Sequence, residues 1–168
     1  MFNLLYWGLF TTRLKESVIG IMLTSVQFTP TSSLEALPSA TFEVDAATTQ
    51  GKAVLEKFSN EAELPGVLIS LGGAPVAAIS RFRFESFMKR AYSAEIYSKR
   101  PLTVLLETVK AGVLSLPSTT LIKDATAEAL GRDDEFFFDP IVVIFNDGSR
   151  KLIDIKQLLR TAFQILAN

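Results

Sequence analysis

Four side chains in the sequence are candidates for binding a ligand: Ser80, Arg81, Arg83 and Asp154. Ser80 and the two arginines stand at the expected start of a helix over residues 81–90, where free backbone N–H groups and the positive end of the helix dipole attract an anion. A phosphate-bearing ligand could dock there. The structural alternative is favoured: Ser80 and Asp154 cap the helices that follow them, and the arginines pair with Glu85 or with the other half of the protein.

The composition excludes most other chemistry. The absence of cysteine rules out disulfides, zinc–thiolate sites and thiol nucleophiles, and the absence of histidine rules out Ser-His-Asp hydrolysis and histidine acid–base catalysis. The phosphate-binding patterns GxxxxGK(S/T) and GxGxxG do not occur. The acidic run 133–135 is expected to be a solvated loop, so no metal site is predicted. The net charge of -1 gives no electrostatic reason to expect nucleic acid as a partner.

The elements that must position the candidate residues follow one pattern twice. From residue 41 the apolar spacing predicts a strand, a helix, two strands joined at Gly72-Gly73, and a second helix. The same order recurs from residue 119, with Asn146-Asp147-Gly148 as the turn between the paired strands. The predicted elements are strand 41–44, helix 49–58, strands 67–71 and 75–79 and helix 81–90 in the first copy, and strand 119–122, helix 125–130, strands 141–145 and 150–153 and helix 155–166 in the second.

The two copies align without a gap from the first hairpin strand into the following helix. Val67 then corresponds to Ile141, and Ser80 to Asp154. The hairpin strands are almost continuously apolar, as is typical of strands covered on both faces, so each half needs the other for burial. We expect a mixed α/β (α+β) fold of two βαββα halves related by pseudo-two-fold symmetry. The expected order is an N-terminal helical extension with a linker over 1–33, a first half over 34–90, a bridging segment over 91–118 and a second half over 119–168.

The first ten residues, MFNLLYWGLF, are apolar, but Arg13 and Lys15 follow them instead of preceding them, so a signal peptide is not expected. With Glu16, these charges also interrupt the apolar run, which argues against a transmembrane helix. Three interpretations stay open. The segment could cover an exposed patch of this domain, which is favoured; it could be an amphipathic helix that rests on a membrane or a partner; or it could be a loosely ordered extension.

The stretches VLISLGGAPVAAISRFRF and IVVIFNDGSRKLIDIKQLL resemble a tandem pair of CBS (cystathionine-beta-synthase) domains, the regulatory Bateman module, over about residues 34–168. The phrases SRFRFESFMKR, EIYSKRPLTVLLE and LIDIKQLLRTAFQIL look like the divergent CBS-like pair found ahead of output domains in bacterial signalling proteins. The resemblance implies a cytoplasmic, non-catalytic regulatory module. Its implied partner is an output domain or protein such as a GGDEF diguanylate cyclase, a histidine kinase or a phosphatase.

The resemblance also implies how a CBS half binds an adenosyl ligand: a Ser or Thr after the second hairpin strand and an Asp three residues later hold the phosphate and the ribose. The first half has Ser80 but Arg83 at these places, and the second has Asp154 and Gln157, so neither half keeps the pair. We therefore expect no cofactor and weak or absent binding of adenine nucleotides. If an anion does bind, we expect Ser80, Arg81 and Arg83 to line its site. The alternative function is therefore a sensor that binds a small molecule, an adenine nucleotide or another anion.

The helices expected over 81–90 and 155–166 carry more apolar residues than one buried face requires, which predicts a homodimer. The apolar residues in question are Phe82, Phe84, Phe87, Met88, Ile155, Leu158, Leu159, Phe163, Ile165 and Leu166. The second of these helices is also expected to make the connection to the output partner.

Overall fold

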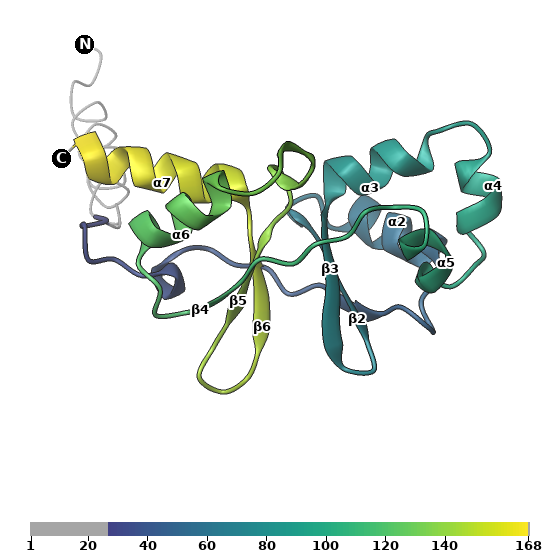
Figure 1. Ribbon diagram of the computed structural model, residues 1–168, viewed down its shortest axis with the longest axis horizontal. Coiled ribbons are helices and arrows are strands. Elements are labelled where there is room, and N and C mark those ends of the chain that lie inside the picture. The colour runs from purple at the N-terminus through teal and green to yellow at the C-terminus, as the bar shows by residue number, and fades with distance from the viewer. Residues whose placement is uncertain (1–26, 168) are drawn as a thin grey trace, which may run out of the picture.

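Two three-stranded sheets form the centre of the computed structural model, which describes residues 27–167 (Figure 1). In each sheet the first strand pairs in parallel with the second, and the second forms an antiparallel hairpin with the third. The first sheet consists of β1 (Glu43–Asp45), β2 (Gly66–Leu71) and β3 (Ala74–Ser80), and the second of β4 (Ser115–Pro117), β5 (Ile141–Ile144) and β6 (Arg150–Ile153). The hairpins project from one side of the molecule, and helices α3 (Arg81–Met88) and α7 (Ile155–Ala167) lie on the other.

The repeat predicted from the sequence is confirmed as two mixed α+β halves of like topology. The helices of the first half are α2 (Gly51–Asn60) and α3, and those of the second are α6 (Ile122–Leu130) and α7. The segment between the halves holds α4 (Ser93–Tyr97) and α5 (Leu102–Leu106), and two single-turn 3-10 helices occur at η1 (Leu34–Ala36) and η2 (Asp134–Phe136). The helical extension expected over 1–33 lies outside the described residues as far as residue 26.

The strand predicted over residues 119–122 is wrong. The parallel partner of β5 is β4, which ends at Pro117, and α6 already begins at Ile122. The residues between them pair with a different part of the chain: the carbonyl of Thr120 accepts a hydrogen bond from Leu34 N–H at 2.9 Å. The segment that the local pattern assigned to the sheet therefore forms its hydrogen bond with a residue far away in the sequence.

Each half takes a short helix from the chain that precedes the other half. Leu34 of η1 is buried in the core of the second half, together with residues of α6 and α7. Conversely, Leu102 and Leu105 of α5 are buried in the core of the first half. Two isolated bridges mark these docking points, Ser33 with Leu121 and Gln50 with Pro101. The halves are therefore interlocked along the chain as well as packed face to face.

A shared core joins the two sheets. Four buried side chains form it, Leu68, Ala78, Val142 and Leu152. They are two pairs of equivalent residues, 74 positions apart, so the contact lies on the pseudo-two-fold axis. The chain before each first strand also crosses the interface: Ala40 exchanges backbone hydrogen bonds with Leu152, and Ala78 N–H donates to Gly112. Both faces of each hairpin are thus buried, one against the helices of its own half and the other against the opposite sheet, as the sequence predicted.

Among helices of the described residues, 27–167, none is both long enough and apolar enough to cross a membrane.

Gly66 provides a test of this interface. A Cβ atom at Gly66 would lie 2.3 Å from the carbonyl oxygen of Ile79 and 3.0 Å from Cγ of Pro140 in the other half. We expect Gly66→Ala to lower the free energy of unfolding by about 1–3 kcal/mol, because both the paired strand β3 and Pro140 of the other half would have to move. Urea denaturation followed by circular dichroism measures the change.

The matched control is Gly131→Ala at the end of α6. Gly131 has φ −79°, and its Cβ would meet its nearest neighbour, the carbonyl of Ala127, at an ordinary 3.5 Å. The free energy of unfolding of this variant should equal that of the parent chain or exceed it by up to about 1 kcal/mol, because alanine reduces the conformational freedom of the unfolded chain. Equal stabilities for the two variants would contradict the close packing described at Gly66.

Candidate functional site

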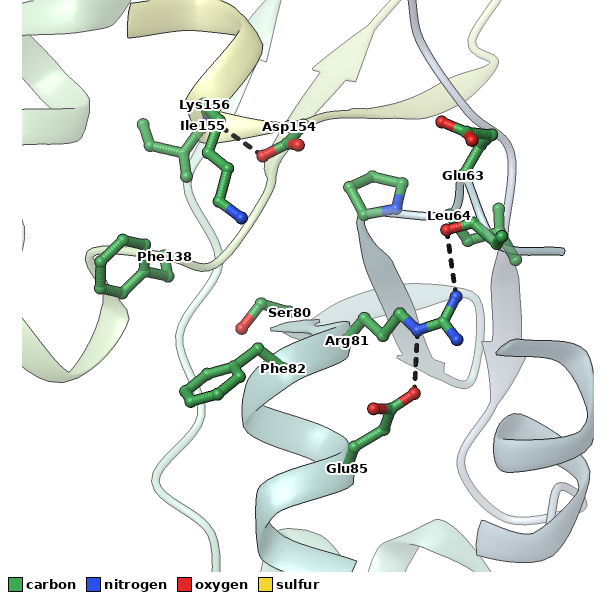
Figure 2. A pocket seen from close by; sticks show the side chains of 12 residues that line it. Glu63, Leu64, Ser80, Arg81, Phe82, Glu85, Phe138, Asp154, Ile155 and Lys156 are labelled. Atoms are coloured by element: carbon green, nitrogen blue, oxygen red, sulfur yellow. Dashed lines mark hydrogen bonds and ion pairs between the residues drawn. The ribbon is translucent and has the colours of Figure 1, made fainter. Parts of the chain in front are cut away.

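A cavity of about 560 Å³ opens between the starts of α3 and α7 (Figure 2). We call it the axial cavity. The first half contributes the loop before β2 and the first turn of α3, and the second half contributes Phe138 and the first turn of α7. Its lining residues are Ala62, Glu63, Leu64, Pro65, Ser80, Arg81, Phe82, Glu85, Phe138, Asp154, Ile155 and Lys156.

Equivalent residues of the two halves face each other across the axial cavity. Leu64 corresponds to Phe138 and Ser80 to Asp154, each pair 74 positions apart, and the same offset relates Phe82 to Lys156. The cavity therefore surrounds the pseudo-two-fold axis. A molecule bound there would contact both halves at once, at the N-terminal ends of the helices that follow the two hairpins.

Ser80 and Asp154 both have the capping geometry that the sequence favoured. Ser80 is buried, and its Oγ accepts a hydrogen bond of 3.4 Å from Arg83 N–H at the start of α3. Asp154 Oδ1 accepts one of 3.0 Å from Lys156 N–H at the start of α7. These contacts satisfy N–H groups that have no partner within the helix. Both residues line the axial cavity, and ligand contact at either one stays a prediction.

Arg81 also lines the cavity, but its guanidinium group is engaged elsewhere. Nε donates to Glu85 at 2.8 Å, and Nη1 donates to the backbone carbonyl of Ala62 at 3.1 Å (Figure 2). The group also lies over the ring of Phe58, 5.5 Å from its centroid. The predicted alternative, a pair with Glu85, is therefore what the structure shows. Arg81 presents mostly its aliphatic stem to the cavity.

Arg83 is the candidate that the structure does not bring to the cavity. Its guanidinium group crosses to the second half, where Nη1 pairs with Asp139 and Nη2 lies 3.3 Å from Glu135. The group also donates to the backbone carbonyl of Lys110 and lies 5.0 Å from the ring centroid of Phe136. Ser80, Arg81 and Asp154 thus share one site, whereas Arg83 connects the two halves.

Asp139 is the buried acceptor at the centre of this connection, which we call the Arg83 clamp. Only 2 % of Asp139 is exposed. Its Oδ1 accepts a 2.8 Å hydrogen bond from Ser80 N–H, and its Oδ2 pairs with Arg83. A buried carboxylate is stable only when it is paired and hydrogen-bonded in this way. The clamp therefore fixes the start of α3 to the loop before β5.

Arg132 supports the same loop from the second half. Its Nη2 donates to the carbonyls of Phe137 and Asp139, at 3.1 and 3.0 Å. Burial lowers the pKa of the Arg132 guanidinium, and the charge of Asp139 opposes that shift. Sequence analysis missed both Asp139 and Arg132. The only signal in the sequence for Asp139 was its place directly before Pro140 and an apolar strand. The repeat gave no further indication, because the equivalent residue in the first half is Pro65.

The run of three phenylalanines divides between the clamp and the cavity. Phe136 lies against Arg83, whereas Phe138 lines the axial cavity and is 56 % exposed. The acidic residues just before them form no group of three or more possible metal ligands, and no such group occurs elsewhere in residues 27–167.

Asp139→Asn tests the clamp. Asparagine can still accept the hydrogen bond from Ser80 N–H, but it removes the buried one of the two carboxylates that pair with Arg83 and leaves only the more exposed Glu135. We expect the free energy of unfolding to fall by about 1.5–3 kcal/mol in urea denaturation. The control is Glu56→Gln, which breaks the exposed pair with Lys52 (3.4 Å) and should change stability by less than about 0.5 kcal/mol. Equal effects would show that the clamp contributes nothing beyond a surface ion pair.

The sequence matches no family model, and no curated protein is significantly similar to it. Similar solved structures do exist. A CBS domain-containing protein from Kribbella flavida superposes with a TM-score of 0.60 at 14% identity, over 78% of this chain and 99% of that one. CBSX2, a CBS-pair protein from Arabidopsis thaliana, gives 0.56 at 14% identity, over 81% and 97% of the two chains.

A third similar structure is the CBS domain protein TA0289 from Thermoplasma acidophilum, with a TM-score of 0.53 at 19% identity, over 81% of this chain and 75% of that one. The shared features are those derived above: two halves of like topology, each a parallel pair extended by a hairpin, packed on a common axis. From residue 27 to 167, this chain therefore has the fold of a CBS-domain pair.

Proposed function

We propose that this chain is a non-catalytic regulatory module that senses a small molecule or a partner and passes the signal to an output protein. The observation that carries the proposal is the axial cavity, because its lining comes from both halves and includes the first residues of α3 and α7. Occupancy of such a site changes the contacts of both halves together. A structure of CBSX2 in complex with AMP, with a TM-score of 0.52, supports ligand binding by proteins of this fold.

A regulatory role agrees with the side chains at the site. The sequence has no histidine or cysteine. Two of the carboxylates lining the cavity already have structural partners: Glu85 pairs with Arg81, and Asp154 caps α7. No nucleophile–base pair results from this arrangement. A second candidate function is that the apolar first ten residues act as a peripheral membrane anchor; these residues lie outside the described part of the chain.

The route to the output partner is the outer face of α7. Half of the residues that suggested a dimer are core residues instead: Phe84, Phe87, Met88, Ile155 and Leu158 are buried. Phe163 and Leu166 remain exposed, at 71 % and 83 %, and Leu159 adds a half-buried surface on the same stripe. Exposed side chains of this size at helical spacing favour an interface. We propose that the chain forms a homodimer through this stripe and that the dimer acts on a cytoplasmic cyclase, kinase or phosphatase.

The dimer is tested by light scattering at micromolar concentration. The parent chain should have the mass of a dimer, and Phe163→Glu should be a folded monomer, because a carboxylate would be desolvated at the interface. Phe82→Glu is the matched control, since Phe82 is equally exposed (74 %) but lies on α3, and it should stay dimeric. A monomeric parent chain, or a dimeric Phe163→Glu variant, would contradict the proposed assembly.

Adenine nucleotides should bind weakly or not at all. Arg83 stands where the nucleotide-binding CBS halves resembled by this sequence have the ribose-binding acid, and it is held by Asp139. Asp154 stands where those halves have the phosphate-binding hydroxyl, so its charge would repel a phosphate. Isothermal titration calorimetry with AMP, ATP and S-adenosylmethionine should therefore give no dissociation constant at or below the micromolar range. Tight binding of any of the three would overturn this expectation.

A further inference from the structure

The two sides of the pseudo-two-fold axis are not equally open. On one side Arg83 pairs with Asp139 and lies over the ring of Phe136, so that these three side chains connect the halves. The residues at the equivalent places on the other side are Gln157, Pro65 and Ala62. Among residues 27–167, the one side-chain hydrogen bond of Gln157 runs from its Nε2 to Thr161 Oγ1 of its own helix, at 3.4 Å. The repeat has thus closed one side with its own side chains and left the other side free.

The open side carries groups of both charges that have no ion-pair partner within residues 27–167. Lys156 is exposed, and its Nζ points into the axial cavity (Figure 2). Asp154 uses Oδ1 for the helix cap and makes no ion pair, and the exposed Glu63 lines the cavity from the loop before β2. The buried Ser80 hydroxyl accepts from Arg83 N–H, but its own proton has no acceptor among the described residues. The cavity therefore offers donors and acceptors together.

Two phenyl rings complete the lining. Phe82 and Phe138 come from opposite halves, and both are more than half exposed although both line the same cavity. Leaving two such rings in water is unfavourable, and a flat apolar group placed between the halves would cover them. The rings lie on the same side of the cavity as Lys156 and the Ser80 hydroxyl (Figure 2).

We propose that the axial cavity binds one small zwitterion per chain, a molecule with a carboxylate, an ammonium group and a flat apolar side group, as in an aromatic amino acid. The carboxylate accepts hydrogen bonds from Lys156 and the Ser80 hydroxyl. Asp154 receives the ammonium group, and the side group lies against Phe82 and Phe138. The inference rests on the proposed function, because it names the ligand class of that same cavity.

The charges of the cavity favour a zwitterion over a phosphate ester. Arg81 and Glu85 neutralise each other, which leaves one cation, Lys156, and two carboxylates. A doubly charged phosphate would meet more negative than positive charge, whereas a zwitterion can pair with both signs. The cavity lies on the pseudo-two-fold axis, and the rotation that relates the halves maps it onto itself, so one chain offers one such site.

Calorimetry with L-phenylalanine and two analogues that each lack one charge tests the proposal on the full chain. 2-Phenylethylamine has no carboxylate, and 3-phenylpropionate has no ammonium group. We expect L-phenylalanine to bind at one site per chain and each analogue to bind at least tenfold more weakly. No binding of L-phenylalanine at millimolar concentration, equal affinities for the three probes, or two sites per chain would overturn the inference.

Two substitutions assign the charges. Lys156→Met should weaken the binding of L-phenylalanine at least tenfold and leave the affinity for 2-phenylethylamine unchanged. Asp154→Asn should weaken the binding of both ammonium-bearing probes and leave the affinity for 3-phenylpropionate unchanged. The variant should stay folded, because asparagine also caps helices. Lys123→Met, an exposed lysine of α6 away from the cavity, should change none of them. Wild-type binding by both cavity variants would remove the proposed site.

The result is separable from that of the dimer experiment. If the chain dimerises through Phe163 but does not bind L-phenylalanine, the zwitterion site is wrong and the regulatory assembly stands. If L-phenylalanine binds with the expected response to both substitutions but the chain is a monomer, the ligand class stands and the proposed assembly is wrong.

Discussion

Two hairpins whose strands are apolar on both faces impose the constraint on which this structure depends. A single half can cover only one face of its sheet with α2 and α3, or with α6 and α7. The uncovered faces meet at Leu68, Ala78, Val142 and Leu152, so that burial is complete only when both halves are present. Because the contact is made by equivalent residues, it generates the pseudo-two-fold axis. It also brings the starts of α3 and α7 to the two sides of one cavity.

The repeat keeps its apolar residues in register but has lost its symmetry in the polar ones. At one pair of equivalent positions stand Arg83 and Gln157, and at another Asp139 and Pro65. A buried arginine–carboxylate pair needs both members, since either one alone would be an uncompensated charge. The Arg83 clamp can therefore exist on one side only. This single difference converts a symmetric interface into one with a closed side and an open side.

The sequence was sufficient for what depends on local signals. The hairpins and the helices that follow them lie within two residues of their expected bounds, because turn residues and apolar spacing specify them directly. Helix α6 ends where expected but begins three residues earlier, and the strand before it was misplaced, since the extended run before α6 pairs with Leu34, far away in the sequence. The exchange of η1 and α5 between the halves has the same long-range origin, and no local pattern reports it.

The candidate site follows the same division: the residues marked by local signals were predicted from the sequence, and those placed by long-range packing were not. Ser80 and Asp154 were found because they follow the hairpins at equivalent places, and their capping role follows from helix chemistry. The partner of Arg83 was not found, because Asp139 has no counterpart in the first half and its burial depends on packing between the halves. Lys156 was also missed. Only the fold shows that this exposed lysine lines the same cavity as Ser80 and Phe82.

Helix α7 connects the cavity to the outer surface in one rigid element. It begins beside the capping residue Asp154 in the cavity lining, and after 13 residues, about 20 Å at 1.5 Å per residue, it ends beyond the exposed Phe163 and Leu166. The halves cannot easily swing apart, because two arginine contacts cross the interface in opposite directions. Arg83 of the first half holds Asp139, and Arg150 of the second half holds Glu43 at 2.7 Å and the carbonyl of Gly73 at 3.0 Å. With both contacts in place, a molecule bound in the cavity would contact the first turns of both α3 and α7. In the proposed function, a displacement of the first turn of α7 carries the signal, because it moves the apolar stripe at the other end of the same helix.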